Sequence, residues 1–351
     1  TGEEVIDENG NPDENHHPTA INSWIRQILH SFTRTAYVGY TATPFANIFI
    51  HERGTTLGEG ADLFPAAFII NLAAPSNYIG PSKVFDLRFR SAQSGGLPLV
   101  KRIADHVSSD GRSGWMPPAH KSWHQPLYEA QNAVPPSLAT AVDSFILACA
   151  IRSRRGQGNE HASMLIHVTR FTAVQRAVHH QVDEYVRHLR QRVLRHIDDE
   201  PVLQRLRTLW EQDFQSTTAR IRAIYPDLEI PSDGSWEDIL CRIAEVLPDI
   251  QIKMINGTAK DALDYADSNG VGIKVIAIGG DKLARGLTLE GLCVSYFLRA
   301  SRMYDTLMQM GRWFGYRPGY LDLCRLYTTP ELSEWFGHIT DAAQRFRATA
   351  H

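Results

Sequence analysis

The clearest candidate binding turn in the chain follows an apolar stretch at residues 275–292, VIAIGGDKLARGLTLEGL. The stretch has the pattern of a buried strand that ends at Gly279 and Gly280, and the charged residues Asp281 and Arg285 come directly after it. Glycines at this position let the backbone approach a ligand closely. Because ligands of open α/β sheets collect at the carboxyl ends of strands, this turn predicts a binding site.

A second group able to do chemistry is a pair of arginines in YDTLMQMGRWFGYRPGY, residues 304–320. The planar, permanently charged fork of arginine stabilises charge that develops on phosphate oxygens. Arg312 and Arg317 are five residues apart, which separates side chains by about 140° on a continuous helix. Both can therefore face one phosphate only if the helix breaks between them, and the nearby helix-breaking residues Gly315 and Pro318 favour such a break.

Two threonine-containing turns complete the candidate site. AYVGYTATPFAN, residues 36–47, has the pattern of a buried strand that runs into a turn with Thr41 and Thr43. LIHVTR, residues 165–170, leads into a helical pattern, so Thr169 and Arg170 can hold a phosphate of a nucleic-acid backbone at the helix N-terminus. Capping of the helix by Thr169 is the alternative, and the sequence leaves both open.

These turns need an α/β scaffold, and the pattern of the chain predicts one. A helix is expected over 17–32, and strands over 36–44 and 68–73, so that the first 75 residues form the closing strands of a sheet. From residue 138 onward, strands at 163–169, 250–256, 274–280, 292–298 and 323–329 alternate with helices, which predicts a mostly parallel sheet with right-handed crossovers. A mainly helical insert, about 185–247, interrupts it.

Residues 76–137 are expected to form an irregular connector, because they are rich in Pro, Gly and Ser and lack periodicity. Its Trp115, His120, Trp123 and His124 indicate either a ligand site or the packing of a long loop. No Cys or carboxylate stands at ligand spacing beside the histidines, which favours packing.

Composition narrows the class of protein. The formal net charge of −3 means that any nucleic-acid binding must come from local basic patches. The four cysteines form no CxxC pair, so neither a disulfide framework nor a metal site is predicted. No apolar run reaches membrane-spanning length and the first residues are acidic and polar, so we expect a cytoplasmic protein with no membrane partner.

Four of these segments resemble the motifs of superfamily-two helicases. TATP resembles motif three, LIHVTR has the position of motif four, the 275–292 segment resembles motif five, and the 304–320 segment resembles motif six. The resemblance implies two RecA-like lobes: a remnant of the first lobe in residues 1–75, and a helicase C-terminal-like lobe in residues 138–351.

The resemblance also implies roles for single residues. In motif six the arginines reach across the lobe interface to the γ-phosphate of ATP, so Arg312 and Arg317 are the predicted catalytic residues. The residues that would bind the nucleotide or couple its state to the strand-binding face are Thr41, Thr43, Asp281, Arg285, Gly286 and Gln309. The residues that would contact nucleic acid are Thr169, Arg170, Gly280 and Thr288. Two of these depart from the usual motif five, since Gly280 replaces a hydroxyl residue and Thr288 replaces a carboxylate.

Taken together, GYTATPFAN, IGGDKLARGLTLEGL and QMGRWFGYRPGY resemble the Z1 domain family, whose bacterial members are described as putative endonucleases with helicase-type ATPase regions, some of them in phage-defence loci. The resemblance covers residues 37–327. It implies an ATP-driven protein that acts on DNA, with RNA left open as a substrate, and partner proteins in a defence complex.

The sequence lacks parts that such an ATPase needs. It contains no GxxxxGK[ST] phosphate loop, and no acidic box follows a strand before Tyr37. We therefore expect ATP and Mg²⁺ to be bound mainly by a lobe upstream of Thr1, and this segment alone to be inactive as an ATPase.

Two other functions compete with a motor. A metal-dependent endonuclease needs clustered carboxylates and a lysine, but PDIQIK, residues 248–253, has Gln251 where a carboxylate belongs. We interpret PDIQIK as a strand of the sheet. The third possibility is a non-catalytic assembly module that binds partner proteins through the connector and the helical insert.

Overall fold

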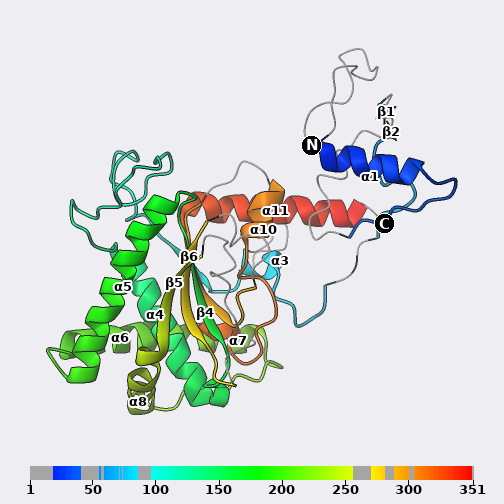
Figure 1. Cartoon of the computed structure of the whole chain (residues 1–351). Coiled ribbons are helices and arrows are strands. Elements are labelled where there is room, and N and C mark those ends of the chain that lie inside the picture. The colour runs from blue at the N-terminus through cyan, green and yellow to red at the C-terminus, as the bar shows by residue number, and fades with distance from the viewer. Residues whose placement is uncertain are drawn as a thin grey trace.

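The computed structural model describes residues 19–40, 55–56, 59–70, 72, 74–85, 96–255, 270–280, 288–299 and 304–349. The helices are α1 (Ala20–His30), α3 (Pro81–Val84), α4 (Pro136–Arg152), α5 (Thr172–Arg195), α6 (Glu200–Leu209), α7 (Ser216–Ile224), α8 (Trp236–Val246), α10 (Tyr304–Met310) and α11 (Pro330–Thr349). Figure 1 shows that α1, with the short hairpin β1 (Thr55–Thr56) and β2 (Gly60–Ala61), lies apart from the main sheet.

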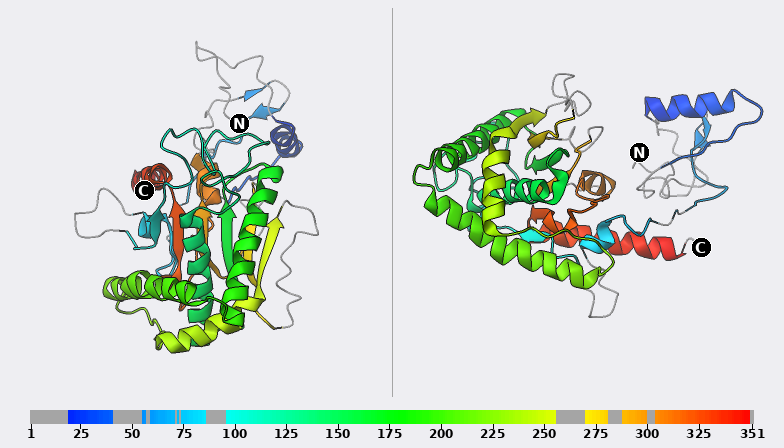
Figure 2. Two further views of the ribbon diagram at one scale, coloured as in Figure 1. Left: turned by 90° about the vertical axis from the view of Figure 1, so that its left-hand side faces the viewer. Right: turned by 90° about the horizontal axis from the view of Figure 1, so that it is seen from below.

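The main sheet is parallel throughout its described residues. Its strands are β3 (Val100–Arg102), β4 (Ala162–His167), β5 (Ile250–Ile255), β6 (Lys274–Gly279), β7 (Leu292–Phe297) and β8 (Arg325–Thr328), in the order β3-β8-β7-β4-β6-β5. The expected α/β class with a parallel sheet flanked by helices is therefore confirmed. Figure 2 (left) shows the strand arrowheads pointing toward the teal segment that begins near residue 104.

The central strands are buried on both faces, as covering helices require. In β4, Met164 pairs with Ile276 and packs in the core that also contains α4, α5 and α8. Its neighbour Leu165 pairs with Ala277 and packs in a separate core. Because side chains alternate along a strand, Phe297 of β7 faces that second side, where it packs with α10 and α11.

The helical insert supports the edge of the sheet rather than standing apart from it. Asp213, in the π-helical turn between α6 and α7, pairs with Lys101 of β3 at 2.6 Å and with Arg325 of β8 at 3.0 Å. α8 begins with a capping box in which Ser235 accepts from the amide of Asp238, an arrangement that satisfies free amides at a helix start.

Segment 76–137 is more structured than an irregular connector. It contributes the edge strand β3, which pairs in parallel with β8. Beyond β3 it folds over the carboxyl ends of the strands, where Trp115 is completely buried and donates from its ring N–H to Oε1 of Gln181 on α5, at 2.8 Å. The low periodicity of this segment concealed these contacts, because they join residues far apart in the sequence.

Two strands expected near the N-terminus are wrong for the residues that are described. Residues 36–40 have no strand pairing, and Tyr37, Val38 and Tyr40 are exposed. Phe68–Ile70 are likewise unpaired and exposed. An apolar, β-branched pattern shows only that residues suit a sheet, and a strand forms only where a neighbouring strand supplies the hydrogen bonds.

Candidate nucleotide and nucleic-acid interface

The turn after β4 has one buried and one exposed polar group. The hydroxyl of Thr169 accepts from the amide of Phe171 at 3.1 Å and lies 2.7 Å from Nε2 of His120. Thr169 is 1% exposed, so its hydroxyl is used inside the protein, three residues before the first helical residue of α5. Arg170 is exposed, with its guanidinium 4.9 Å from the centre of the Phe171 ring. Of this turn, Arg170 is the group that a phosphate can reach.

Gly280 lies at the carboxyl end of β6 and packs directly against this turn. A Cβ on Gly280 would lie 2.7 Å from Nε2 of Gln175, 3.4 Å from Cα of Arg170 and 3.5 Å from the carbonyl oxygen of Thr169. Gln175, in the first turn of α5, donates from that Nε2 to the Thr169 carbonyl at 3.0 Å. The close backbone approach that the glycine predicts is thus an approach to the protein's own α5 turn.

Arg312 and Arg317 lie beyond the helix that sequence periodicity indicated. α10 ends at Met310, so the two arginines do not share a continuous helix. Gly315, with φ of 137°, pairs across to Ile79. Such a φ strongly favours glycine. The helix therefore ends before both arginines, instead of breaking between them as we expected.

The two arginines differ in what surrounds them. The Arg317 guanidinium donates to the carbonyl oxygens of Trp313 at 3.2 Å and of Tyr316 at 2.7 Å, so it holds its own turn together. Arg312 is half-buried, and burial lowers the pKa of its guanidinium; the group still carries its charge at neutral pH. The neighbouring ring of Trp313 packs 5.2 Å from that of Phe297, which puts the start of this turn at the carboxyl end of β7.

The remaining predicted residues are spread over described and undescribed parts of the chain. Gln309 and Thr288 are both exposed. Thr41, Thr43, Asp281, Arg285 and Gly286 lie outside the described residues, so the predicted roles of these five stay predictions.

A group that motif reasoning did not assign to the site is the loop 119–125, AHKSWHQ. His120 lies beside the Thr169 turn, and its ring is 5.7 Å from that of Phe171. His124 bonds the Trp115 carbonyl at 2.9 Å through Nε2. Loop packing, the favoured interpretation of these histidines, is confirmed. No local sequence pattern could have predicted the contact between His120 and Thr169, because 49 residues separate them.

Comparison with known proteins adds the family. A family model for the Z1 domain matches residues 137–350. The chain belongs to the Z1 domain family. No curated protein and no solved structure matches the chain. The Z1 match begins in α4 and runs past the end of α11, so the edge strand β3 and the loop 119–125 pack against the Z1 domain from outside its matched range.

Other kinds of site find no support in the described part of this Z1 protein. No cluster of three or more His, Cys, Asp or Glu residues there has the geometry to hold a metal ion. PDIQIK is strand β5 with the residues before it, as we expected. None of the described helices is long and apolar enough to cross a membrane.

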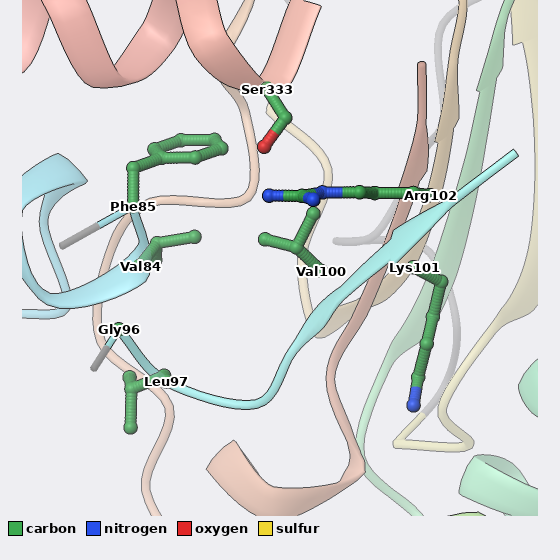
Figure 3. A pocket seen from close by; sticks show the side chains of 8 residues that line it. All are labelled: Val84, Phe85, Gly96, Leu97, Val100, Lys101, Arg102 and Ser333. Atoms are coloured by element: carbon green, nitrogen blue, oxygen red, sulfur yellow. The ribbon is translucent and has the colours of Figure 1, made fainter. Parts of the chain in front are cut away.

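A cavity of about 530 Å³ lies at the β3 edge of the sheet, between α3 and α11 (Figure 3). It is lined by Val84, Phe85, Gly96, Leu97, Val100, Lys101, Arg102 and Ser333. None of the residues predicted to bind nucleotide or nucleic acid lines it, so the cavity is not part of the candidate site.

Proposed function

We propose that this chain is the C-terminal part of an ATP-dependent motor that acts on DNA, or on RNA, in a bacterial defence system with partner proteins, and that residues 138–351 form its second, RecA-like lobe. The observation that carries the proposal is the contact of Gly280 with the Thr169–Arg170 turn. It joins two segments about 110 residues apart, each of which resembles a strand-contacting helicase motif, at the carboxyl edge of one parallel sheet. That edge is where ligands of open α/β sheets bind.

Arg312 is the proposed arginine finger. It lies in the turn after α10, next to the carboxyl end of β7, and it is half-buried, so its charge acts on a phosphate through a medium of lower dielectric than water. Arg317 has the distinct role of positioning this turn, because it donates to the carbonyls of residues 312–314. ATP and Mg²⁺ are bound mainly by a first lobe that carries the phosphate loop.

The arrangement of α1 supports a first lobe that covers it. Ser23 and Arg26, on its polar side, bond to Glu59 and Gly60 of the same chain. Ile21, Trp24 and Ile28 are 61–69% exposed on the other side. A helix normally buries its apolar face, and in this proposal the sheet of the first lobe packs on that face, with residues 1–75 belonging to that lobe.

The experiment measures ATP hydrolysis by the complete gene product, with and without DNA. We expect DNA to stimulate turnover and Arg312→Ala to lower it by about 10³-fold or more, the range for arginine fingers. Arg187→Ala, which removes an exposed arginine of α5, is the matched control and should hydrolyse ATP as the wild type does. A wild-type rate for Arg312→Ala refutes the finger, and absence of ATP hydrolysis by the wild type with DNA refutes the motor.

A further inference from the structure

We propose that the loop 119–125 is a stacking platform for an unpaired base of a nucleic-acid strand, with Trp123 as the stacking ring. The proposal rests on the proposed nucleic-acid-acting function and adds a base contact to it. Two tryptophans of one segment behave oppositely: Trp115 is completely buried, whereas Trp123 is 79% exposed.

The loop that carries Trp123 is held at both ends. His120 bonds the Pro117 carbonyl through Nδ1 and Thr169 through Nε2, each at 2.7 Å. The hydroxyl of Thr169 donates to Nε2, which leaves the ring proton on Nδ1 for Pro117. His124 is tied to the Trp115 carbonyl. The exposed indole therefore projects from an ordered loop, and stacking on it costs little conformational entropy.

The base of this loop is fastened by a buried amide. Gln181 of α5 accepts from the Trp115 ring N–H at 2.8 Å, and its own Nε2 donates to the carbonyl of Pro126 at 2.6 Å and to Oδ1 of Asn132 at 2.8 Å. One side chain thus joins the two sides of the loop to α5. With the loop anchored in this way, the exposure of Trp123 is a property of the fold.

Basic side chains lie beside the platform. Burial lowers the pKa of His120, and the nearby charges of His124, Arg170 and Arg299 lower it further, so basic groups from three segments gather at this place. Lys121, in the loop itself, is exposed. These groups suit the phosphates of a strand whose bases stack on the indole.

The combination of an aromatic ring with cations favours a single strand over other partners. An apolar protein partner needs an apolar patch around the ring, but both sequence neighbours of Trp123 are polar and Lys121 is charged. A base-paired duplex exposes its base faces only at its ends, whereas every unpaired base offers a face to stack on. The platform also adjoins Arg170, the exposed group of the turn that the motor would use to hold a strand.

The test measures binding of a fluorescein-labelled 12-nucleotide oligothymidylate to the full chain by fluorescence anisotropy. We expect Trp123→Ala to weaken binding about tenfold, the typical loss for one stacking aromatic, and Trp123→Phe to restore most of it. Trp335→Ala is the matched control and should bind as the wild type does. Trp335 is 43% exposed on α11, which packs on the opposite face of the sheet from α5.

A second strand, of the same length but without bases, separates stacking from charge. Trp123→Ala should bind this abasic strand as the wild type does, whereas Lys121→Ala should weaken both strands. Equal binding of oligothymidylate by Trp123→Ala and the wild type overturns the platform, as does an equal loss on the abasic strand or no binding by the wild type. Unchanged Tm in each variant shows that folding is intact.

The outcome is separable from that of the motor. If DNA stimulates ATP hydrolysis and Arg312→Ala abolishes it, while Trp123→Ala binds oligothymidylate normally, the motor stands and the platform is wrong. If Trp123→Ala loses binding and the complete protein hydrolyses no ATP, the platform stands as a binding site and the motor is wrong.

Discussion

Replacing Gly280 by alanine tests whether the contact between the two motif-bearing segments holds the site together. The new Cβ would lie 2.7 Å from Nε2 of Gln175, closer than non-bonded atoms come. The Arg170 Cα, at 3.4 Å from the new Cβ, is already in van der Waals contact and limits how far the backbone can shift. The amide of Gln175 must therefore move, and its hydrogen bond to the Thr169 carbonyl breaks. Loss of such a bond costs about 1 kcal/mol, and overpacking of a buried site adds about 1 kcal/mol or more.

We thus expect Gly280→Ala to lower the free energy of unfolding by about 2 kcal/mol. Urea denaturation followed by tryptophan fluorescence measures it, and an unchanged m-value confirms that the same surface unfolds. Gly337→Ala is the matched control, since a Cβ there meets no atom within 4 Å. In the interior of α11 this change should stabilise the protein, by about 0.5–1 kcal/mol.

A double-mutant cycle identifies the clashing group. In a Gln175→Ala background the amide is gone, so Gly280→Ala should cost about 1 kcal/mol less than it does in the wild type. Full stability of the Gly280→Ala single variant, or an equal cost in both backgrounds, would refute the contact that carries the proposed function.

Three further outcomes are expected. Trp115→Phe keeps most of the ring but leaves the buried oxygen of Gln181 without its donor, and should lower the free energy of unfolding by about 1–3 kcal/mol in the same urea assay. Burial raises the pKa of Asp213, but the nearby cations, Arg325 first, outweigh burial and leave the pKa below its usual 3.8. The stability that this carboxylate contributes is therefore present above pH 3.8 and is lost as the pH falls below it. Asp213→Asn should accordingly flatten the fall in Tm below pH 4. Burial lowers the pKa of His120 below its usual 6.5. The stability that its neutral ring contributes is therefore present above pH 6.5 and is lost as the pH falls below it. His120→Gln should reduce the fall in Tm between pH 7.5 and 5.5, and an equal fall in both proteins would contradict this.

The central strands were predictable from the sequence because burial on both faces leaves a continuous apolar run. β6 and β7 lie within the ranges that their apolar residues indicated, β4 begins one residue before its range, and the start of α10 at Tyr304 was also expected. The edge strand β3 was not, since Val100–Arg102 has only partial burial and two basic residues. Its position depends on Lys101 reaching Asp213, more than 100 residues later, and no local pattern records such a contact.

The candidate site shows the same division between local and distant information. The glycine pair and the arginines could be singled out because their residue types have few uses at the end of a strand. What each does depends on its contacts in the fold: Gly280 makes room for Gln175, a partner distant in the sequence, whereas Arg317 organises its own turn. Thr169, chosen as a phosphate ligand, instead bonds His120 of the loop that covers it. Some residues of the helicase-like motifs in this chain are therefore explained by how its segments pack on one another. In our proposal, a ligand at this edge is contacted by Arg170 and the loop 119–125, because packing leaves polar groups of both exposed.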